Sequence, residues 1–376
     1  MNILILTADY PPIEGGIGTV SLQLSRELAS LGHSVTVIAP GFPGMEDFDA
    51  AEPARIVRYR GYGLGWFRFF PMLLKSLRYL PRTDLVLGIN IAYGGVIGRI
   101  GRALFGKPYV TFAYAYEFLK FRWNPPARWL LRHVYRRAQR TVAISAFTRD
   151  RLIEFGVKDS AIDLILPGAP EASPVDDNAL QALKERYVIN GHRIVLGVGR
   201  FVARKGHTTL VEALPKILES HPDTVLVLVG QGPRMSATTQ VAGGLGVRNN
   251  LRLPGRIDDD ELAALYTLCD CFALPTGADK RGQVEGFGLV FSEAHAYGKP
   301  VVAGRSGGVV DAVLDGETGL LVAPEDPDAL ADAILSILDN PDRARAMGEA
   351  GKRRVEQELN WTRFTQRLLD AVEASA

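Results

Sequence analysis

The amino-acid sequence predicts an α/β protein with two doubly wound domains, each built on a largely parallel sheet. The chain has 376 residues, more than one hydrophobic core usually supports. Short apolar runs alternate with amphipathic segments along its whole length, as in repeated strand–helix–strand units. Residues 166–178 contain three prolines and no periodicity, which predicts a linker. We therefore expect two domains facing each other across a cleft, with ligands at the carboxyl ends of the strands.

The strand predictions rest on short apolar runs bounded by polar or turn residues. Runs that are apolar on both faces are typical of strands buried inside a parallel sheet. In the first half the expected strands are Ile3–Thr7, Ser34–Ile38, Ile56–Tyr59, Leu85–Leu87, Tyr109–Phe112, Arg140–Ile144 and Ile162–Ile165. In the second half they are Ile194–Val198, Val225–Val229, Leu251–Leu253, Cys271–Ala273, Pro300–Val302 and Leu320–Val322.

Amphipathic segments between these runs predict the helices. The acidic run Asp258–Asp260 is expected to cap the start of one of them, because an aspartate side chain accepts from free backbone N–H groups at a helix N-terminus. The expected helices are Thr19–Leu31, Pro126–Ala138, Thr208–Ser220, Asp259–Ala264, Leu289–Tyr297 and Pro327–Leu338.

Composition excludes several protein classes. Apolar residues make up 47% and charged residues 23%, which is ordinary for a soluble globular protein and excludes wholesale disorder. Two cysteines, Cys269 and Cys271, exclude a disulfide framework, and we expect reduced core thiols. The six histidines lack HExxH or HxxxH spacing, so we expect no metal site. The first apolar run lacks the basic leader of a signal peptide and no run is long enough to span a bilayer, so we expect a cytoplasmic protein.

The formal net charge of +1 hides an imbalance between the halves. Residues 1–170 hold 21 Lys and Arg against 13 Asp and Glu, whereas residues 171–376 hold 22 against 29. Within residues 53–151 the count is 19 basic against 3 acidic. This asymmetry indicates that the first half faces something anionic.

Three loops that follow expected strands hold the candidate ligand-binding residues. In the first, Gly15, Gly16 and Gly18 precede the helix expected near Thr19. Backbone N–H groups there can approach a phosphate closely, although a tight turn without a ligand is an equal alternative. The loop matches neither GxGxxG nor GxxxxGK[ST], so the sequence lacks a dinucleotide fingerprint and a Walker loop.

The second loop carries Arg200 and Lys205, directly after the expected strand Ile194–Val198. Two fixed cations at a strand end suit a diphosphate, since arginine offers a planar fork and lysine a point charge. A solvated basic turn is the alternative interpretation.

The third loop combines Glu285 with the turn Gly286-Phe287-Gly288, and Glu293 lies eight residues after Glu285 inside the next helix. Such a helix N-terminus can bind phosphate while the carboxylates accept hydrogen bonds from sugar hydroxyls. A paired-carboxylate hydrolase and two surface acids are the alternatives. The nearby Gly304–Gly308 segment matches GxSxG, but no histidine follows Ser306, which argues against a hydrolase triad.

These segments together resemble glycosyltransferase family 4. The resemblance is carried by EGFGLVFSEAHAYGKPVVAGRSGGVVDAVLDGETGLLV, GVGRFVARKGHTTLVEA, VLVGQGP and the GGIG loop, and it covers nearly the whole chain. Members are retaining, metal-independent sugar transferases of the GT-B fold, with two Rossmann-like domains. The resemblance implies an acceptor-binding domain over residues 1–168, a nucleotide-sugar-binding domain over 179–358, and a helix over 359–376 that crosses back to the first domain.

The resemblance also implies roles for individual residues. Catalytic roles fall to Arg200, Lys205 and Glu285. The donor would be bound by Gly15, Gly16, Arg200, Lys205, Ile257, Glu285, Gly286, Phe287, Gly288, Leu289 and Glu293. On the acceptor side stand Tyr114 and Glu117, where Tyr114 replaces a histidine that the family often carries. A tyrosine with its usual pKa near ~10 is a poor base at neutral pH.

The expected function is transfer of a sugar from a nucleotide-diphosphate sugar to a hydroxyl of a lipid-linked or glycan acceptor in cell-envelope or polysaccharide synthesis. No cofactor, metal or nucleic-acid partner is expected. Two alternatives remain: a nucleotide-sugar epimerase of the same architecture, and a non-catalytic protein that binds sugar or lipid. A NAD dehydrogenase is set aside because the glycine fingerprint is missing.

Two stretches of the first half predict peripheral contact with the inner face of a membrane. Residues 66–82 combine aromatic and leucine side chains with four cations and no acid, and residues 118–140 add seven cations, again without an acid. Aromatic side chains at a headgroup boundary and cations at anionic lipid would bind such a surface. A helix that packs on the sheet with its basic residues in water is the alternative.

Overall fold

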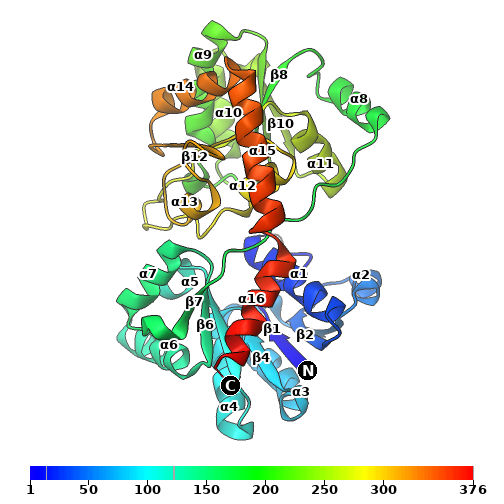
Figure 1. The fold of residues 1–376 in the computed structure, drawn as a ribbon, viewed down its shortest axis with the longest axis vertical. Coiled ribbons are helices and arrows are strands. Elements are labelled where there is room, and N and C mark those ends of the chain that lie inside the picture. The colour runs from blue at the N-terminus through cyan, green and yellow to red at the C-terminus, as the bar shows by residue number, and fades with distance from the viewer. Residues whose placement is uncertain (14, 122, 376) are drawn as a thin grey trace. The chain divides into compact units, whose positions relative to one another are not determined.

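The computed structural model describes residues 1–13, 15–121 and 123–375. The chain forms two compact units. Unit 1 contains residues 1–167 and the C-terminal segment from Trp361, and unit 2 contains residues 168–360. Each unit has a parallel sheet with helices on both of its faces (Figure 1). The predicted fold class, two doubly wound α/β domains, is therefore confirmed.

Unit 1 is built on a seven-stranded sheet in the order β3-β2-β1-β4-β5-β6-β7. Because β1 pairs in parallel with both β2 and β4, the strand order reverses between β1 and β4. Loops that follow strands on either side of such a reversal diverge and leave room for a ligand. The strands are β1 (Asn2–Leu6), β2 (Ser34–Pro40), β3 (Arg55–Tyr59), β4 (Leu85–Gly88), β5 (Tyr109–Ala113), β6 (Arg140–Ala143) and β7 (Ile162–Leu164).

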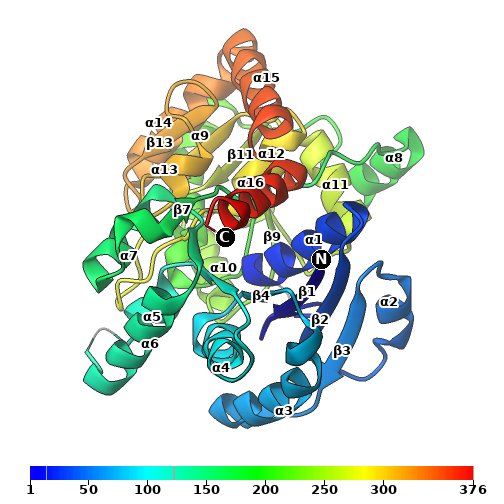
Figure 2. The ribbon, with the colours of Figure 1, turned by 60° about the horizontal axis from the view of Figure 1, so that its bottom comes forward.

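The last helix of the chain belongs to unit 1. It packs beside α1 (Figure 2), where Thr362 donates a hydrogen bond to Glu27 (2.9 Å) and the ring of Phe364 stacks on Phe112. The helices of unit 1 are α1 (Gly16–Ser30), α2 (Glu46–Ala51), α3 (Phe69–Tyr79), α4 (Val96–Phe105), α5 (Tyr116–Leu119), α6 (Pro125–Arg137), α7 (Ala146–Phe155) and α16 (Trp361–Glu373).

Unit 2 is built on a six-stranded sheet in the order β10-β9-β8-β11-β12-β13, which reverses between β8 and β11. Its strands are β8 (Arg193–Val198), β9 (Thr224–Val229), β10 (Leu251–Gly255), β11 (Cys271–Leu274), β12 (Val301–Gly304) and β13 (Gly319–Val322). Its helices are α8 (Asp177–Arg186), α9 (His207–Ser220), α10 (Met235–Gly244), α11 (Asp259–Leu268), α12 (Leu289–Ala296), α13 (Val309–Ala312), α14 (Pro327–Leu338) and α15 (Pro341–Gln357).

Most local predictions agree with these elements. All thirteen expected strands form within two residues of their expected ends. Asp258 caps α11 by accepting a hydrogen bond from the backbone N–H of Glu261 (2.8 Å). Cys269 and Cys271 are buried free thiols, as expected.

The start of the first helix was predicted wrongly. It begins at Gly16 rather than near Thr19, so Gly18 lies inside the helix. A side chain at Gly18 would come within 2.8 Å of the carbonyl oxygen of Ile13. The glycine therefore serves close packing between helix and loop.

Among the helices in the described ranges, none combines the length and the apolar character needed to cross a bilayer.

Candidate functional site

The strand reversal of unit 2 brings Lys205 and Glu285 together. The loop after β8 lies against the loop after β11, where the backbone N–H of Gly277 donates to the carbonyl of Arg204 (2.8 Å). Gly206 fits only because it lacks a side chain, which would overlap the carbonyl of Pro275. This contact sets the Lys205 ammonium 2.9 Å from the Glu285 carboxylate. Two residues predicted separately from sequence thus form one ion pair.

The pair is largely shielded from water. The Lys205 side chain is 10% exposed and that of Glu285 is 16% exposed. Burial alone would raise the pKa of Glu285, but the charges of Lys205 and Arg204 hold it below its usual range. Glu285 is therefore ionised at neutral pH. Arg204, which the sequence analysis missed, supplies a second positive charge near this carboxylate.

The glycine turn after Glu285 is fixed by a neighbouring turn. The backbone N–H of Gly308 donates to the carbonyl of Glu285 (2.9 Å), and Gly307 has room there only without a side chain. Ser306 is the serine of the GxSxG match. Its hydroxyl donates a hydrogen bond to the backbone carbonyl of Thr276 (2.7 Å). The turn leads into α12 through Gly288, which has a positive φ of 95°. The first N–H groups of α12 thus lie beside the Lys205–Glu285 pair.

Glu293 lies within α12, eight residues after Glu285. Its carboxylate accepts a hydrogen bond from the hydroxyl of Tyr266 (3.0 Å), whose ring stacks on Tyr297. Burial raises the pKa of Glu293, while this hydrogen bond and the charge of Lys205 oppose the rise. Tyr266 was not predicted, and no local pattern pointed to it, because it lies 27 positions before Glu293.

Two further donor-side predictions occupy loops of unit 2. Arg200 is exposed directly after β8, and Ile257 is half-buried between β10 and α11. The side chain of Phe287 is buried in the core, so only its backbone can line a site. His207, next to the Lys205 loop, stacks on Phe201, and burial followed by the charge of Lys205 lowers its pKa to about 3. It is a neutral packing residue.

Unit 1 has its own polar cluster at the β1/β4 reversal. Asn90, after β4, donates to the carboxylate of Asp9 (2.8 Å), which follows β1, and accepts from the backbone N–H of Ala8 (2.6 Å). The hydroxyl of Thr7 donates to the carbonyl of Asp9 (2.7 Å). This fixed carboxylate was missed by the sequence analysis, although both polar residues directly follow expected strands.

The predicted acceptor-side residues form a strained turn after β5. The backbone N–H of Tyr114 donates to Glu117 (2.6 Å), and Ala115 between them has φ 79° and ψ −64°, a rare conformation for a residue with a side chain. Burial raises the pKa of Glu117 to about 7, against the effect of that hydrogen bond. Burial, with the charge of Glu117, raises the pKa of Tyr114 well above its usual value, so its hydroxyl stays neutral.

The predicted glycines of the first loop lie at the start of α1. Gly15 is the residue before the helix, with φ 143°, and Gly16 is its first residue; both are exposed. The first backbone N–H groups of an α-helix have no partner within the helix, so this end of α1 suits an anionic ligand.

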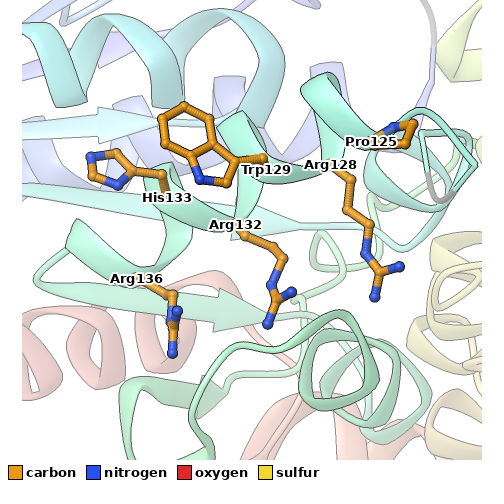
Figure 3. A pocket seen from close by; sticks show the side chains of 6 residues that line it. All are labelled: Pro125, Arg128, Trp129, Arg132, His133 and Arg136. Carbon is orange, nitrogen blue, oxygen red and sulfur yellow. The ribbon is translucent and has the colours of Figure 1, made fainter.

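The two basic stretches of unit 1 expose large apolar side chains beside cations. On residues 62–79 these are Tyr62, Leu64, Trp66, Phe67, Phe70 and Leu74, and near α6 they are Trp123, Trp129 and Leu130. Figure 3 shows Arg128, Arg132 and Arg136 extending from one side of α6, and Trp129 and His133 extending in a different direction. The rings of Trp129 and His133 stack with centroids 5.7 Å apart. Residue 122, within the second predicted stretch, lies outside the described residues.

In residues 1–13, 15–121 and 123–375, no group of three or more His, Cys, Asp or Glu side chains is arranged to hold a metal ion.

Family comparisons match both halves of the chain. The model of "Glycosyltransferase Family 4" matches residues 14–172, and that of "Glycosyl transferases group 1" matches residues 181–354. A GDP-mannose-dependent alpha-(1-6)-phosphatidylinositol monomannoside mannosyltransferase from Mycolicibacterium smegmatis is 32% identical over an alignment of 382 residues, which covers 98% of this chain and 97% of the relative. A glycogen synthase from Mycobacterium tuberculosis is 27% identical, with 96% and 92% covered.

Solved structures show the same fold. A crystal structure of Anabaena Alr3699/HepE in complex with UDP matches with a TM-score of 0.84 at 19% identity, covering 100% of both chains. A sucrose-phosphate synthase from Thermosynechococcus elongatus matches with a TM-score of 0.83 at 24% identity, again covering 100% of both.

Proposed function

This chain belongs to glycosyltransferase family 4, and we propose that it transfers mannose from GDP-mannose to a hydroxyl of a lipid-linked acceptor related to phosphatidylinositol mannoside. The observation that carries the proposal is the buried Lys205–Glu285 pair beside the α12 N-terminus. The relative from M. smegmatis, which aligns along nearly the whole chain, supports the choice of donor and acceptor.

The proposed reaction retains the configuration of the sugar. The bond between the sugar C1 and the diphosphate oxygen breaks, and the acceptor oxygen bonds to C1 on the same face. The acceptor proton passes to the departing phosphate oxygen. Negative charge grows on the leaving diphosphate, so cations and N–H groups already aimed at it lower the barrier, by about 3–4 kcal/mol for one well-aimed donor in other enzymes.

The unit 2 residues suit these steps. Arg200, Lys205 and the first N–H groups of α12 would hold the diphosphate, and Glu285 would face the reacting sugar. Glu293 would accept from the ribose hydroxyls, since Tyr266 already fixes its carboxylate. The positive charge that would stabilise the leaving diphosphate comes from the Arg200 and Lys205 side chains. This supports a reaction that needs no metal ion. The comparisons do not favour the two alternatives, a nucleotide-sugar epimerase and a non-catalytic protein that binds sugar or lipid.

We further propose that unit 1 works at an anionic membrane surface. The exposed aromatic and leucine side chains of residues 62–79 and of α6 lie next to cations, as at other interfacial surfaces. A membrane-resident acceptor would then be presented directly to unit 1.

Two measurements test the proposed function. GDP-mannose at 100 times its dissociation constant is expected to stabilise the protein by ~2.7 kcal/mol against thermal unfolding, more than UDP- or ADP-sugars at the same concentration. Arg200→Ala and Lys205→Ala are each expected to lower mannose transfer about a hundredfold. Protection by no nucleotide sugar, or near-normal transfer by both variants, would refute the proposal.

A further inference from the structure

Packing holds Tyr266 in place beside the carboxylate of Glu293. The Tyr266 side chain is buried, its ring stacked on Tyr297 with centroids 5.4 Å apart and tilted against Phe272 at 5.9 Å. Because these contacts fix the ring, they also fix its hydroxyl, which lies 3.0 Å from Oε2 of Glu293. The same hydroxyl lies 3.5 Å from the carbonyl oxygen of Val290, so the carboxylate is the closer acceptor.

This hydrogen bond distinguishes the two carboxylate oxygens of Glu293. Oε2 accepts from Tyr266, whereas in the part of the chain that the structure describes Oε1 has no hydrogen-bond partner. The Glu293 side chain is half-buried and Oε1 is not enclosed, so a ligand can reach it. A carboxylate with one oxygen fixed and the other open is oriented toward a ligand that donates hydrogen bonds, such as a sugar hydroxyl.

The charge on Glu293 also depends on Tyr266. Burial raises the pKa of Glu293, the Tyr266 hydrogen bond and then the charge of Lys205 lower it, and Asp259 at the start of α11 raises it. Burial, followed by the charge of Glu293, raises the pKa of Tyr266 well above its usual value, so its hydroxyl remains a donor. Without this donor, Glu293 would keep its proton to a higher pH and accept hydrogen bonds less well.

We propose that Tyr266 is a positioning residue for the donor nucleotide: it directs Oε1 of Glu293 to the ribose hydroxyls, so that the site selects a ribonucleotide over one without those hydroxyls. The inference rests on the proposed function, in which Glu293 accepts from the ribose. It adds a residue that acts only through Glu293. A tyrosine that merely filled space would leave this selection unchanged, because its ring alone does the filling.

The test removes the hydroxyl and keeps the ring. Tyr266→Phe retains the stack on Tyr297. The matched control is Tyr297→Phe, which makes the same change on the neighbouring ring, whose hydroxyl accepts from the backbone N–H of Ser173 (3.2 Å). Titration calorimetry of the full chain at pH 7 measures the binding of GDP and of 2′,3′-dideoxy-GDP.

The ratio of the two affinities is the decisive quantity. We expect the wild type and Tyr297→Phe to bind GDP about tenfold more tightly than the dideoxy compound, as is typical for hydrogen bonds to a charged group. In Tyr266→Phe this ratio should fall at least threefold, while the affinity for the dideoxy compound stays within a factor of two of that of the control.

The pH profile of binding gives a second readout. GDP-mannose is the probe, because its diphosphate does not titrate between pH 6 and pH 8. The affinity of Tyr266→Phe for GDP-mannose should fall more steeply than that of Tyr297→Phe as the pH is lowered, since Glu293 then takes up a proton. Adding Glu293→Gln to each variant should remove this difference, because an amide does not titrate in this range.

Every outcome bears on the inference. An equal loss of affinity for GDP and the dideoxy compound in Tyr266→Phe would show a structural role only and overturn it. So would an affinity ratio or a pH profile like that of Tyr297→Phe, or a wild type that binds both compounds equally. Mannose transfer is measured in parallel. A chain that transfers mannose but fails these tests refutes only this inference, whereas a chain that does not bind GDP-mannose refutes the proposed function.

Discussion

Replacing Lys205 with methionine is the most informative change to the candidate site. Methionine keeps much of the lysine stem but removes the ammonium that lies 2.9 Å from the Glu285 carboxylate. Glu285 would then be an acid in a largely buried position without its closest partner. Removing one partner of a buried ion pair typically costs 3–5 kcal/mol. We expect about 3 kcal/mol, at the lower end of that range, because both side chains keep some exposure and Arg204 remains nearby.

The same change should reverse the pH dependence contributed by Glu285. In the wild type its folded pKa lies below the ordinary value of 4.5, so the pair stabilises the fold above that pH and this contribution is lost on acidification. Without Lys205, burial dominates and the folded pKa rises above 4.5. The unfolded chain then releases its proton first, and stability falls as the pH rises. The free-energy difference between wild type and variant should therefore grow between pH 4 and pH 7.

Guanidinium unfolding measured by two probes provides the assay. The four tryptophans all belong to unit 1, so their fluorescence follows that unit, whereas far-UV circular dichroism follows both. The control is Lys216→Met, which breaks a surface pair with Asp332 in unit 2 and should change stability little. If Lys205→Met is no less stable than Lys216→Met, or its pH profile runs parallel to that of the wild type, the ion-pair reasoning fails.

Three further predictions concern the proposed reaction. Glu285→Gln should mainly lower turnover, about a hundredfold, while Glu293→Gln should mainly weaken nucleotide binding; equal loss of GDP affinity in both, measured by calorimetry, would contradict this division. Mannose transfer should persist in EDTA. Complete loss of transfer in EDTA, restored by added manganese, would overturn the proposal that the reaction needs no metal ion. The protein should sediment with anionic vesicles less strongly as salt rises, and Trp66→Ser combined with Arg78→Glu should weaken this without changing donor affinity. No binding at low salt would exclude the membrane surface.

The elements of the fold could be predicted because their signals are local. A run such as Ile3–Thr7 is apolar at every position but the last, which indicates a strand covered on both faces. The Asp258 cap likewise needs only a helix that starts one residue later. The start of α1 was missed because glycine has low helix propensity, and the packing of Gly18 against the preceding loop outweighs that preference.

The site could be predicted in its residues but not in its contacts. Lys205 and Glu285 were each expected from their loops, yet their ion pair joins positions 80 residues apart, and only the strand order brings those loops together. The cluster around Asp9 was missed for the same reason: its partner Asn90 follows a different strand.

The tyrosine in place of the family's frequent histidine bears on where the acceptor proton goes. Burial keeps Tyr114 neutral far above physiological pH, so its hydroxyl can donate a hydrogen bond but cannot take a proton. Glu285 is ionised, but its charge is engaged by Lys205, which makes it a weaker base. The leaving diphosphate becomes more basic as its bond to the sugar breaks, and in the proposed reaction it lies on the face that the acceptor attacks. A site with a neutral tyrosine therefore loses no step of the proposed reaction, and the rate should depend more on the cations that hold the diphosphate than on any side-chain base.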